Sequence, residues 1–378
     1  MPTHLWLALV FVSCAPSLRA SVPLRGDALD ERVEALRVKG RVPGLALAII
    51  EDGQVAALRT YGVRDVESQA PLTLDTVMYA ASFTKFVFAT LVQTLVEEGR
   101  VELDRPLAQY LPKPLPEYGK YADLAGDPRW QRLTARMILE HASGFPNFRS
   151  LNDDGKLDIK VDPGSRYAYS GEGINLLQFV LEQGLGLDVG VRLHQRFAEL
   201  GMTRSGLVWR DEFGPDVTTG YTVDGVAEAH HQRGSVRAAG SLDTSIRDFA
   251  TFLAAFMRGE GLSNASRDEL LRPQLAITSA HQFPTFAPGT DPSLGLSAGL
   301  GVVLFSGPQG RGFFKGGHDD WTDNTLVCLE MRRRCVVLLS NSARAQAIYP
   351  AVVRAVLGET GLPWRWEYSD PSSPPPID

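Results

Sequence analysis

The segment Ser82-Phe83-Thr84-Lys85 places a hydroxyl and an amine three residues apart. A serine hydroxyl is a poor nucleophile near neutral pH, so it needs a base within hydrogen-bond reach and donors that face the developing oxyanion. Apolar residues at helical spacing predict a helix over Phe83–Glu98, which puts Lys85 one turn along from Ser82 on the same face. The Ser82 N–H is then an unpaired donor of the first turn. This segment could therefore supply a nucleophile, its base and half of an oxyanion hole.

The residues before this tetrapeptide bear on whether the lysine can act as a base. Val77–Ala81 is mostly apolar and is expected to bury the segment that follows it. Burial removes solvent from an ammonium group and lowers its pKa, so a buried Lys85 could hold a neutral amine. The ordinary alternative is a serine that caps the helix beside a lysine exposed on the surface.

Strand-like segments lie near both ends of the chain, and helical segments lie between them. The first two strands flank a turn composition at Glu51–Gln54, which predicts an antiparallel hairpin. The expected strands are Leu45–Ile50, Val55–Tyr61, 298–305, 312–315, 324–330 and 335–340, and the expected terminal helices are 28–38 and 348–357. Strands at both ends imply one sheet. The predicted fold class is α/β (α+β), an antiparallel sheet flanked by terminal helices, with an inserted, mostly helical lobe.

This pattern divides the chain into two lobes. We expect residues 21–79 and 262–363 to form the sheet with its terminal helices, and residues 80–261 to form the helical lobe. The end of the chain, 364–378, is rich in proline and serine, so we expect a disordered tail.

The N-terminus carries an apolar run, Leu5–Val12, that is too short to span a bilayer. We interpret residues 1–20 as a signal peptide cleaved after Ala20, which makes the protein exported, periplasmic or secreted. Two alternatives are lipid attachment at Cys14 and a buried N-terminal strand.

Composition is that of a soluble globular protein, with 44% hydrophobic and 22% charged residues among 378. The net charge of −6 gives no basic field for nucleic acid, and we expect no cofactor and no transmembrane helix. Cys328 and Cys335 flank a predicted turn at Met331-Arg332, so they could face each other across a hairpin. A disulfide and two buried thiols both remain open, as does the oligomeric state.

Two further elements follow the serine in order, Tyr169-Ser170-Gly171 and Lys315-Gly316-Gly317. With them the sequence resembles the serine β-lactamase and DD-peptidase superfamily, specifically the class C-like branch that includes esterases. The resemblance spans residues 28 to 357 and implies a β-lactamase/transpeptidase-like fold. Leu139–Pro146 and Ala239–Leu242 are similar to secondary landmarks of that family.

The resemblance implies a role for each matched residue. Ser82 would attack the carbonyl of a small-molecule or peptide acyl substrate, while Lys85 and Tyr169 share general-base duty. Lys315 would supply positive charge and receive a substrate carboxylate. Gly316 and Gly317 would let the substrate backbone approach the strand, and the His318 N–H would be the second oxyanion donor.

Two departures from the family pattern concern the substrate. Gly171 stands where penicillin-recognising members carry asparagine, and Gly316 stands where they carry threonine or serine. Efficient β-lactam turnover is therefore less favoured. We predict class C-like β-lactamase or D-Ala peptidase-type amide hydrolysis, with an esterase of the same fold and a non-catalytic acylatable sensor as alternatives.

Two other motifs compete with this interpretation. Gly295–Gly299 matches the G-x-S-x-G pattern around Ser297, but it precedes a strand-like segment instead of a helix. Gly317–Asp320 together with His230-His231 could suggest a metal site. The spacing fits no compact ligand pattern, so we expect a loop at the rim of the active site and no metal.

Overall fold

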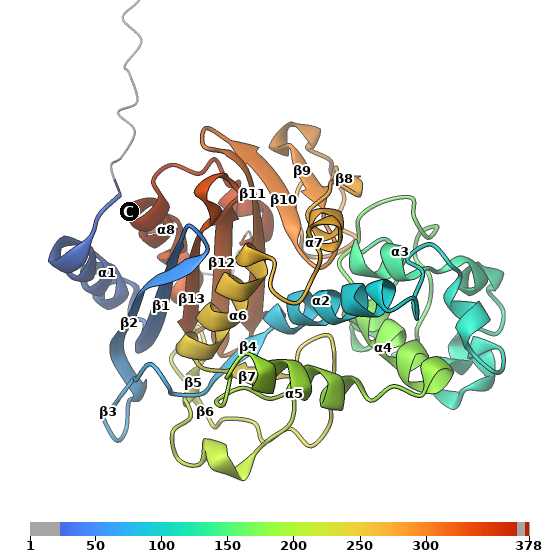
Figure 1. Cartoon of the computed structure of the whole chain (residues 1–378), viewed down its shortest axis with the longest axis horizontal. Coiled ribbons are helices and arrows are strands. Elements are labelled where there is room, and N and C mark those ends of the chain that lie inside the picture. Colours follow the sequence, from blue (N-terminus) through green and yellow to red (C-terminus); the bar gives the residue numbers. More distant parts are fainter. Residues whose placement is uncertain (1–22, 369–374, 378) are drawn as a thin grey trace, which may run out of the picture.

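The computed structural model describes residues 23–368 and 375–377 (Figure 1). The predicted signal peptide and the lipidation alternative at Cys14 lie outside the described residues. In the described part, no helix has the length and apolar character needed to cross a membrane.

One large antiparallel sheet organises the fold, in the order β3-β2-β1-β13-β12-β11-β10-β9-β8. Its strands are β1 Gly44–Glu51, β2 Gln54–Asp65, β3 Ala70–Pro71, β8 Leu275–Ile277, β9 Leu296–Ala298, β10 Val303–Gly307, β11 Gly310–Asp319, β12 Thr322–Leu329 and β13 Arg334–Ser340. The first and last strands of the chain are neighbours, because β1 pairs with β13 from Leu45↔Ser340 to Ile50↔Cys335. The predicted fold class and the joining of N-terminal and C-terminal strands are confirmed.

Helices cover both faces of this sheet (Figure 1). They are α1 Gly26–Gly40, α2 Phe83–Glu97, α3 Ala135–Leu139, α4 Gly171–Leu185, α5 Val189–Glu199, α6 Ile246–Arg258, α7 Asn264–Leu270, α8 Tyr349–Leu357 and α9 Trp364–Glu367. Two small sheets, β4 Met78–Ala81 with β7 Leu242–Thr244 and β5 Gly220–Tyr221 with β6 Ala227–Glu228, lie outside the large one.

The uninterrupted apolar run of β1 is explained by burial on both faces. Ala46 and Ala48 join the core cluster that contains Phe249 of α6, whereas Leu45 and Leu47 join the cluster formed with α1 and α8. Side chains alternate between the faces of a strand, so a strand covered on both sides needs apolar residues throughout.

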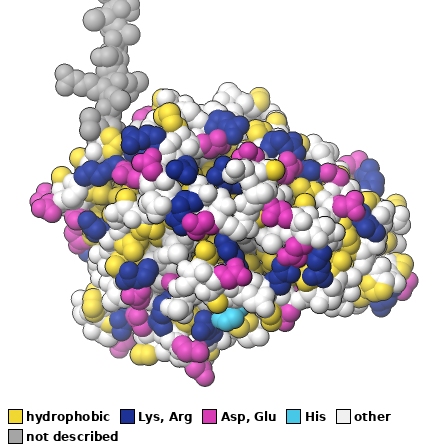
Figure 2. Space-filling model, viewed as in Figure 1, with side chains coloured by type: hydrophobic (Ala, Val, Ile, Leu, Met, Phe, Trp, Pro, Cys, Tyr) yellow, Lys and Arg dark blue, Asp and Glu magenta, His cyan; other side chains and the backbone are white. Residues whose placement is uncertain are grey.

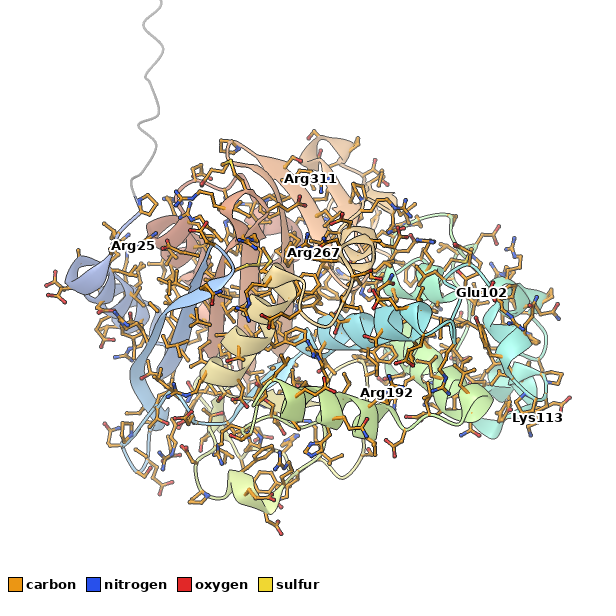
Figure 3. All side chains as sticks on the ribbon, in the orientation of Figure 1. Arg25, Glu102, Lys113, Arg192, Arg267 and Arg311 are labelled. Carbon is orange, nitrogen blue, oxygen red and sulfur yellow. A yellow bond between two sulfur atoms is a disulfide. The ribbon has the colours of Figure 1, made fainter. Side chains whose placement is uncertain are left out.

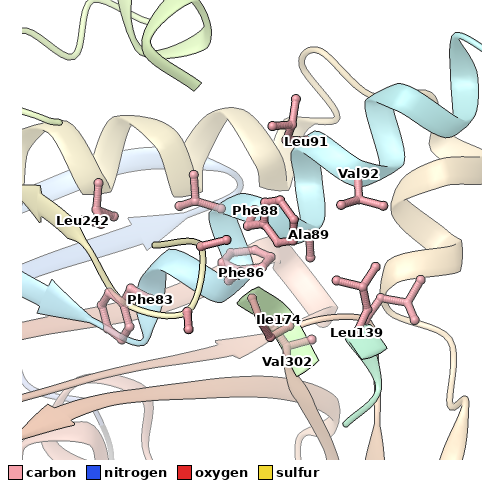
Figure 4. Close-up of a cluster of buried hydrophobic side chains, with 14 of the residues drawn as sticks. Phe83, Phe86, Phe88, Ala89, Leu91, Val92, Leu139, Ile174, Leu242 and Val302 are labelled. Carbon is pink, nitrogen blue, oxygen red and sulfur yellow. The ribbon is translucent and has the colours of Figure 1, made fainter. Parts of the chain in front are cut away.

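Helix α2 runs through the larger core, where Phe83, Phe86 and Phe88 are fully buried (Figure 4). The Phe86 ring lies 5.0 Å from that of Phe256 in α6 and 6.1 Å from that of Phe313 in β11. Because α6 also packs on the sheet, helices from the middle of the chain cover one sheet face. The division into lobes at residues 80 and 262 remains a prediction.

The surface is charged and mixed. Lys and Arg side chains alternate with Asp and Glu across the face shown in Figure 2. Several form ion pairs between elements; Arg192 of α5, labelled in Figure 3, pairs with Glu98 just after α2. Exposed pairs of this kind contribute little to stability individually.

Two sequence predictions about the last third of the chain are wrong. Residues 298–305 form a hairpin between β9 and β10 instead of one strand, with Gly301 at the turn at φ +82°. A Cβ there would lie 2.7 Å from Ala89 of α2, so the turn needs glycine.

The second wrong prediction is the disordered tail from residue 364. The first residues of this segment form helix α9, and Trp366 is 1% exposed. Further on, the Ile377 N–H donates to the Ala347 carbonyl. Residues 369–374 and 378 lie outside the described residues.

Cys328 and Cys335 are directly opposite each other on β12 and β13 and form a disulfide. Both are fully buried. Of the two alternatives that the sequence left open, the structure has the bonded one.

Candidate active site

Ser82 lies at the start of α2, directly after the short strand β4. The preceding residue, Ala81, has a left-handed backbone with φ +47°, a conformation that is costly for alanine and turns the chain sharply into the helix. The Ser82 side chain caps no backbone N–H of α2. Its Oγ is therefore available for chemistry.

Lys85 is the partner of this hydroxyl. Its Nζ lies 2.9 Å from Ser82 Oγ and also donates to the carbonyl of Ala239. The side chain is 1% exposed, which excludes the alternative of a surface lysine beside a capping serine. Burial lowers the pKa of Lys85, Lys315 lowers it further by repulsion, and the attraction of Tyr169 opposes the shift. The net direction favours a neutral amine next to the hydroxyl.

Thr84 fixes the turn that presents these two side chains. Its Oγ1 donates to the Ala81 carbonyl at 2.6 Å and accepts the Leu242 N–H at 2.9 Å. Leu242 begins β7, which pairs with β4. The Ala239–Leu242 landmark therefore has a structural role, because it both anchors the turn and supplies the carbonyl that holds Lys85.

Tyr169 approaches from the segment before α4. Its neighbour Ser170 caps that helix by accepting the Gly173 N–H at 2.9 Å. The ring centroid of Tyr169 lies 4.9 Å from Lys85 Nζ and 5.0 Å from Lys315 Nζ, and its Oη lies 3.3 Å from Lys315 Nζ. A phenol between two amines is well placed to exchange protons with either one.

His141, from the Leu139–Pro146 landmark, packs against Tyr169 at 4.3 Å between ring centroids. Its Nδ1 accepts the Ser170 N–H at 3.2 Å, and it is 4% exposed. Burial, together with Lys85 and Lys315, lowers the pKa of His141 well below its ordinary value. The imidazole is thus neutral, and its ring packs against the Tyr169 ring.

Strand β11 brings Lys315 next to the same tyrosine. Burial lowers the pKa of Lys315 to about 8, and Glu367 opposes the shift. Strand β10 pairs with β11 only as far as Phe314. Among the described residues, one edge of the segment from Lys315 to Asp319 therefore has no strand partner. A Cβ on Gly317 would lie 2.6 Å from the Ala80 carbonyl and 3.3 Å from the Phe83 backbone nitrogen. Glycine therefore lets this edge pass close to Ser82.

His318 follows Gly317 and therefore points to the opposite face of β11. Its ring contacts Phe283 and Tyr368, at 5.6 and 5.9 Å between centroids. Burial and the two nearby lysines lower the pKa of His318 to about 3, so the side chain is neutral. Its predicted contribution, a backbone N–H, does not depend on the imidazole.

Glu367 of α9 is a residue of this site that sequence reasoning missed. A Cβ added to Gly316 would lie 1.8 Å from Glu367 Oε1, so the carboxylate fills the space that a side chain at position 316 would need. Gly316 itself was a signal, since it departs from the family pattern. Residue 367 itself gave no signal in the sequence, because it lies in a segment whose composition predicts disorder.

Gly171, the second position that departs from the family pattern, is also explained by a neighbouring side chain. A Cβ there would lie 2.6 Å from the ring of Phe148, and its N–H donates to Asn147 Oδ1 at 3.0 Å. The absence of a side chain at 171 thus lets an aromatic ring and a neighbouring amide approach the start of α4.

The competing motifs do not form sites of their own in the described residues. Ser297 lies in β9, paired on both sides by β8 and β10, so the strand-turn-helix geometry of a G-x-S-x-G nucleophile is lacking. His230 contacts Asp243 at 3.2 Å. In the part of the chain that the structure describes, no group of three His, Cys, Asp or Glu side chains could hold a metal ion.

Comparison with known sequences gives one family and several relatives. The family model described as Beta-lactamase matches residues 29–357. The D-aminopeptidase of Gluconobacter oxydans is 24% identical over 354 residues, which cover 87% of this chain and 62% of that protein. Penicillin-binding protein 4 of Amycolatopsis lactamdurans is 29% identical over 190 residues, 47% of this chain and 48% of that protein. The chain thus spans less than two thirds of the length of both relatives.

Solved structures share the fold. The octameric penicillin-binding protein homologue from Pyrococcus abyssi has a TM-score of 0.66 at 24% identity, covering 84% of this chain and 73% of that one. A class C beta-lactamase has a TM-score of 0.66 at 17% identity, covering 84% of this chain and 90% of that one.

Proposed function

The chain belongs to the Beta-lactamase family, and on this premise we propose that it is a serine hydrolase of the class C-like branch. It would cleave an amide through an acyl-enzyme on Ser82. The observation that carries the proposal is the buried Lys85 amine 2.9 Å from a serine hydroxyl that caps no helix. The D-aminopeptidase names of several relatives support an amide as the bond that is cleaved.

In the proposed acylation, Ser82 Oγ forms a bond to the substrate carbonyl carbon and gives its proton to the Lys85 amine. The proton then passes through Tyr169 to the leaving nitrogen as the carbon–nitrogen bond breaks. The distances from the Tyr169 ring centroid to Lys85 Nζ, 4.9 Å, and to Lys315 Nζ, 5.0 Å, support this route. A positioned base of this kind typically contributes about 10² to 10⁴ in rate.

Deacylation reverses the roles. Water gives a proton to the same base and attacks the ester carbonyl, and Ser82 leaves with a proton. In both steps the carbonyl oxygen becomes negative, and we assign its donors to the backbone N–H groups of Ser82 and His318. The close approach of Gly317 to the Phe83 backbone supports this assignment, because it brings the edge of β11 next to the start of α2.

Export belongs to the same proposal. The Cys328–Cys335 disulfide supports it, because disulfides persist mainly in oxidising compartments. Fractionation of cells that express the full chain tests it: we expect the protein outside the cytoplasm and shortened by the mass of residues 1–20.

The experiment that tests the catalytic proposal is intact mass spectrometry after exposure to D-alanine p-nitroanilide, a penicillin and a p-nitrophenyl ester, with Ser82→Ala as the control. We expect an adduct on the peptide that contains Ser82, none in the control, and release of p-nitroaniline. An adduct only with the ester would favour the esterase alternative, and a penicillin adduct without turnover would favour a sensor. Equal activity of the Ser82→Ala protein would refute the assignment.

A further inference from the structure

The Ala239 carbonyl accepts a hydrogen bond from the Lys85 amine, so its orientation affects whether that amine faces Ser82. The carbonyl belongs to the peptide unit that joins Ala239 to Gly240. Glycine permits a wider range of backbone angles than other residues do, so the local sequence does not fix this unit. Contacts on either side must therefore hold it in place.

Side chains anchor the peptide units before and after this one. On one side, the Ala239 N–H donates to Asn175 Oδ1 of α4 at 3.3 Å. On the other side, the Gly240 carbonyl accepts the Tyr79 hydroxyl of β4 at 2.6 Å. Each peptide unit is planar, so it can turn only about the soft dihedrals at the two α-carbons that join it to its neighbours. Two anchored neighbours therefore restrict the unit between them, and with it the carbonyl that receives Lys85.

The Tyr79 ring is itself held by two charged side chains. The guanidinium carbon of Arg233 lies 3.6 Å from the ring centroid, which is a close cation–π contact. Arg233 Nη1 also donates to Asp243 Oδ1 at 3.2 Å. Asp243 lies directly opposite Tyr79 in the pairing of β7 with β4. Opposite residues of paired strands point to the same face, so the carboxylate, the guanidinium and the ring can pack together.

Water has little access to these contacts. The Asp243 side chain is fully buried and that of Arg233 is 17% exposed, so their attraction is stronger than it would be at the surface. Burial raises the pKa of Tyr79 to about 12, and Arg233 opposes the shift. The hydroxyl therefore keeps its proton at neutral pH and remains a donor to the Gly240 carbonyl.

We propose that Tyr79 is a positioning residue whose hydroxyl keeps the Ala239 carbonyl directed at Lys85. Arg233 and Asp243 in turn keep the Tyr79 ring in place. The inference rests on the proposed function, because it assigns to these residues the orientation of the catalytic base. Without the hydroxyl, the carbonyl would sample more orientations, and the amine would spend less time within reach of the nucleophile.

The variant Tyr79→Phe tests this role, because it removes the hydroxyl and retains the ring. We expect kcat on D-alanine p-nitroanilide to fall by about three- to tenfold, the size of one lost hydrogen bond. KM should stay unchanged, because the contacts of the bound substrate remain. The control Tyr110→Phe also removes a phenol hydroxyl bonded to the backbone, at the Glu102 N–H, and should leave kcat unchanged. A normal kcat in Tyr79→Phe would overturn the proposal.

A double-variant cycle distinguishes positioning of the base from a general effect on the fold. If Tyr79 acts through Lys85, Tyr79→Phe should not lower kcat further in the Lys85→Ala protein. An equal fold loss in the two backgrounds would show that the hydroxyl acts independently of the amine, and the proposal would be wrong. Circular dichroism melting of each variant establishes that it is folded.

Arg233→Ala provides a second test that leaves the Tyr79 hydroxyl intact. Loss of the contact with the ring should lower kcat by about two- to fivefold, the size of a cation–π interaction. In the Tyr79→Phe protein the same change should have no further effect on kcat, since the hydroxyl that it supports is already absent. Losses that multiply would place Arg233 on a separate route and contradict its part in the proposal.

Mass spectra of the unmodified protein separate this inference from the proposed function. Absence of any adduct on Ser82 would refute the proposed function and the positioning role with it. Acylation and turnover by the unmodified protein, together with an equal kcat in Tyr79→Phe, would refute the positioning role and leave the proposed function standing.

Discussion

At the scale of single residues, the site depends on amines that the protein has removed from water. Lys85 and Lys315 are 1% and 4% exposed, and burial lowers the pKa of both. Two ammonium groups this close to one phenol would repel each other, so the arrangement favours a state in which one of them is neutral. A proton held by such a group of three is easily transferred among them.

Replacing Lys85 tests its proposed role as base. We expect Lys85→Ala to lower kcat on D-alanine p-nitroanilide by about 10² or more, because the Ser82 hydroxyl loses its proton acceptor. Ser82→Ala should abolish turnover, and the melting temperature of both variants establishes that they are folded. A Lys85→Ala enzyme with nearly normal kcat would contradict the mechanism.

Lys315 predicts a pH-dependent stability. Its pKa is about 8 in the folded protein against 10.5 for an ordinary lysine. Between those values the unfolded chain binds a proton that the folded protein lacks, so the free energy of unfolding rises with pH across that window. We expect Lys315→Met to be more stable than the unmodified protein at pH 7, with a difference that shrinks by pH 10. Urea unfolding at pH 7, 8.5 and 10 measures it, and a constant difference would count against a depressed pKa.

At the scale of elements, the short helix α9 determines which side chain strand β11 can accommodate at position 316. Its Glu367 lies where a side chain at Gly316 would project, so the two positions constrain each other. The identity of residue 316 therefore cannot be understood from the strand alone.

This coupling gives a prediction for paired variants. Gly316→Ala should lower the free energy of unfolding by about 2 kcal/mol, because its Cβ would overlap Glu367 Oε1. Combining it with Glu367→Ala removes the overlap, so the double variant should lose less stability than the sum of the single ones. Chemical denaturation of the four proteins measures the coupling, and strictly additive losses would argue against contact between the two residues.

The sequence predicted those elements in which local pattern and burial agree. The hairpin of β1 and β2, the helix α2 and the segment from Ser82 to Lys85 all follow from apolar periodicity and turn residues. It failed where a distant contact decides the outcome. The chain turns at Gly301, where α2 passes so close that only glycine fits. Helix α9 folds because Trp366 packs against Tyr167 and Phe314. Neither contact has a local signature in the sequence.

At the scale of the whole molecule, the buried disulfide fastens two central strands of the sheet. It closes a loop with a sequence separation of 7, for which loop-closure entropy gives about 2 kcal/mol. We expect the double variant Cys328→Ala, Cys335→Ala to lose about that much stability in urea unfolding. Alkylation of the denatured, unreduced protein should leave both cysteines unmodified, and their modification would contradict the bond.

The pairing of β1 with β13 sets a condition on biosynthesis. Leu45 pairs with Ser340 on the neighbouring strand. The centre of the sheet therefore cannot form until most of the chain has been synthesised. Contacts this distant along the chain form slowly. Until then β1 is paired with β2 alone and its other edge has no partner, and a nascent chain whose sheet is incomplete in this way is in the state that a narrow export channel can accept.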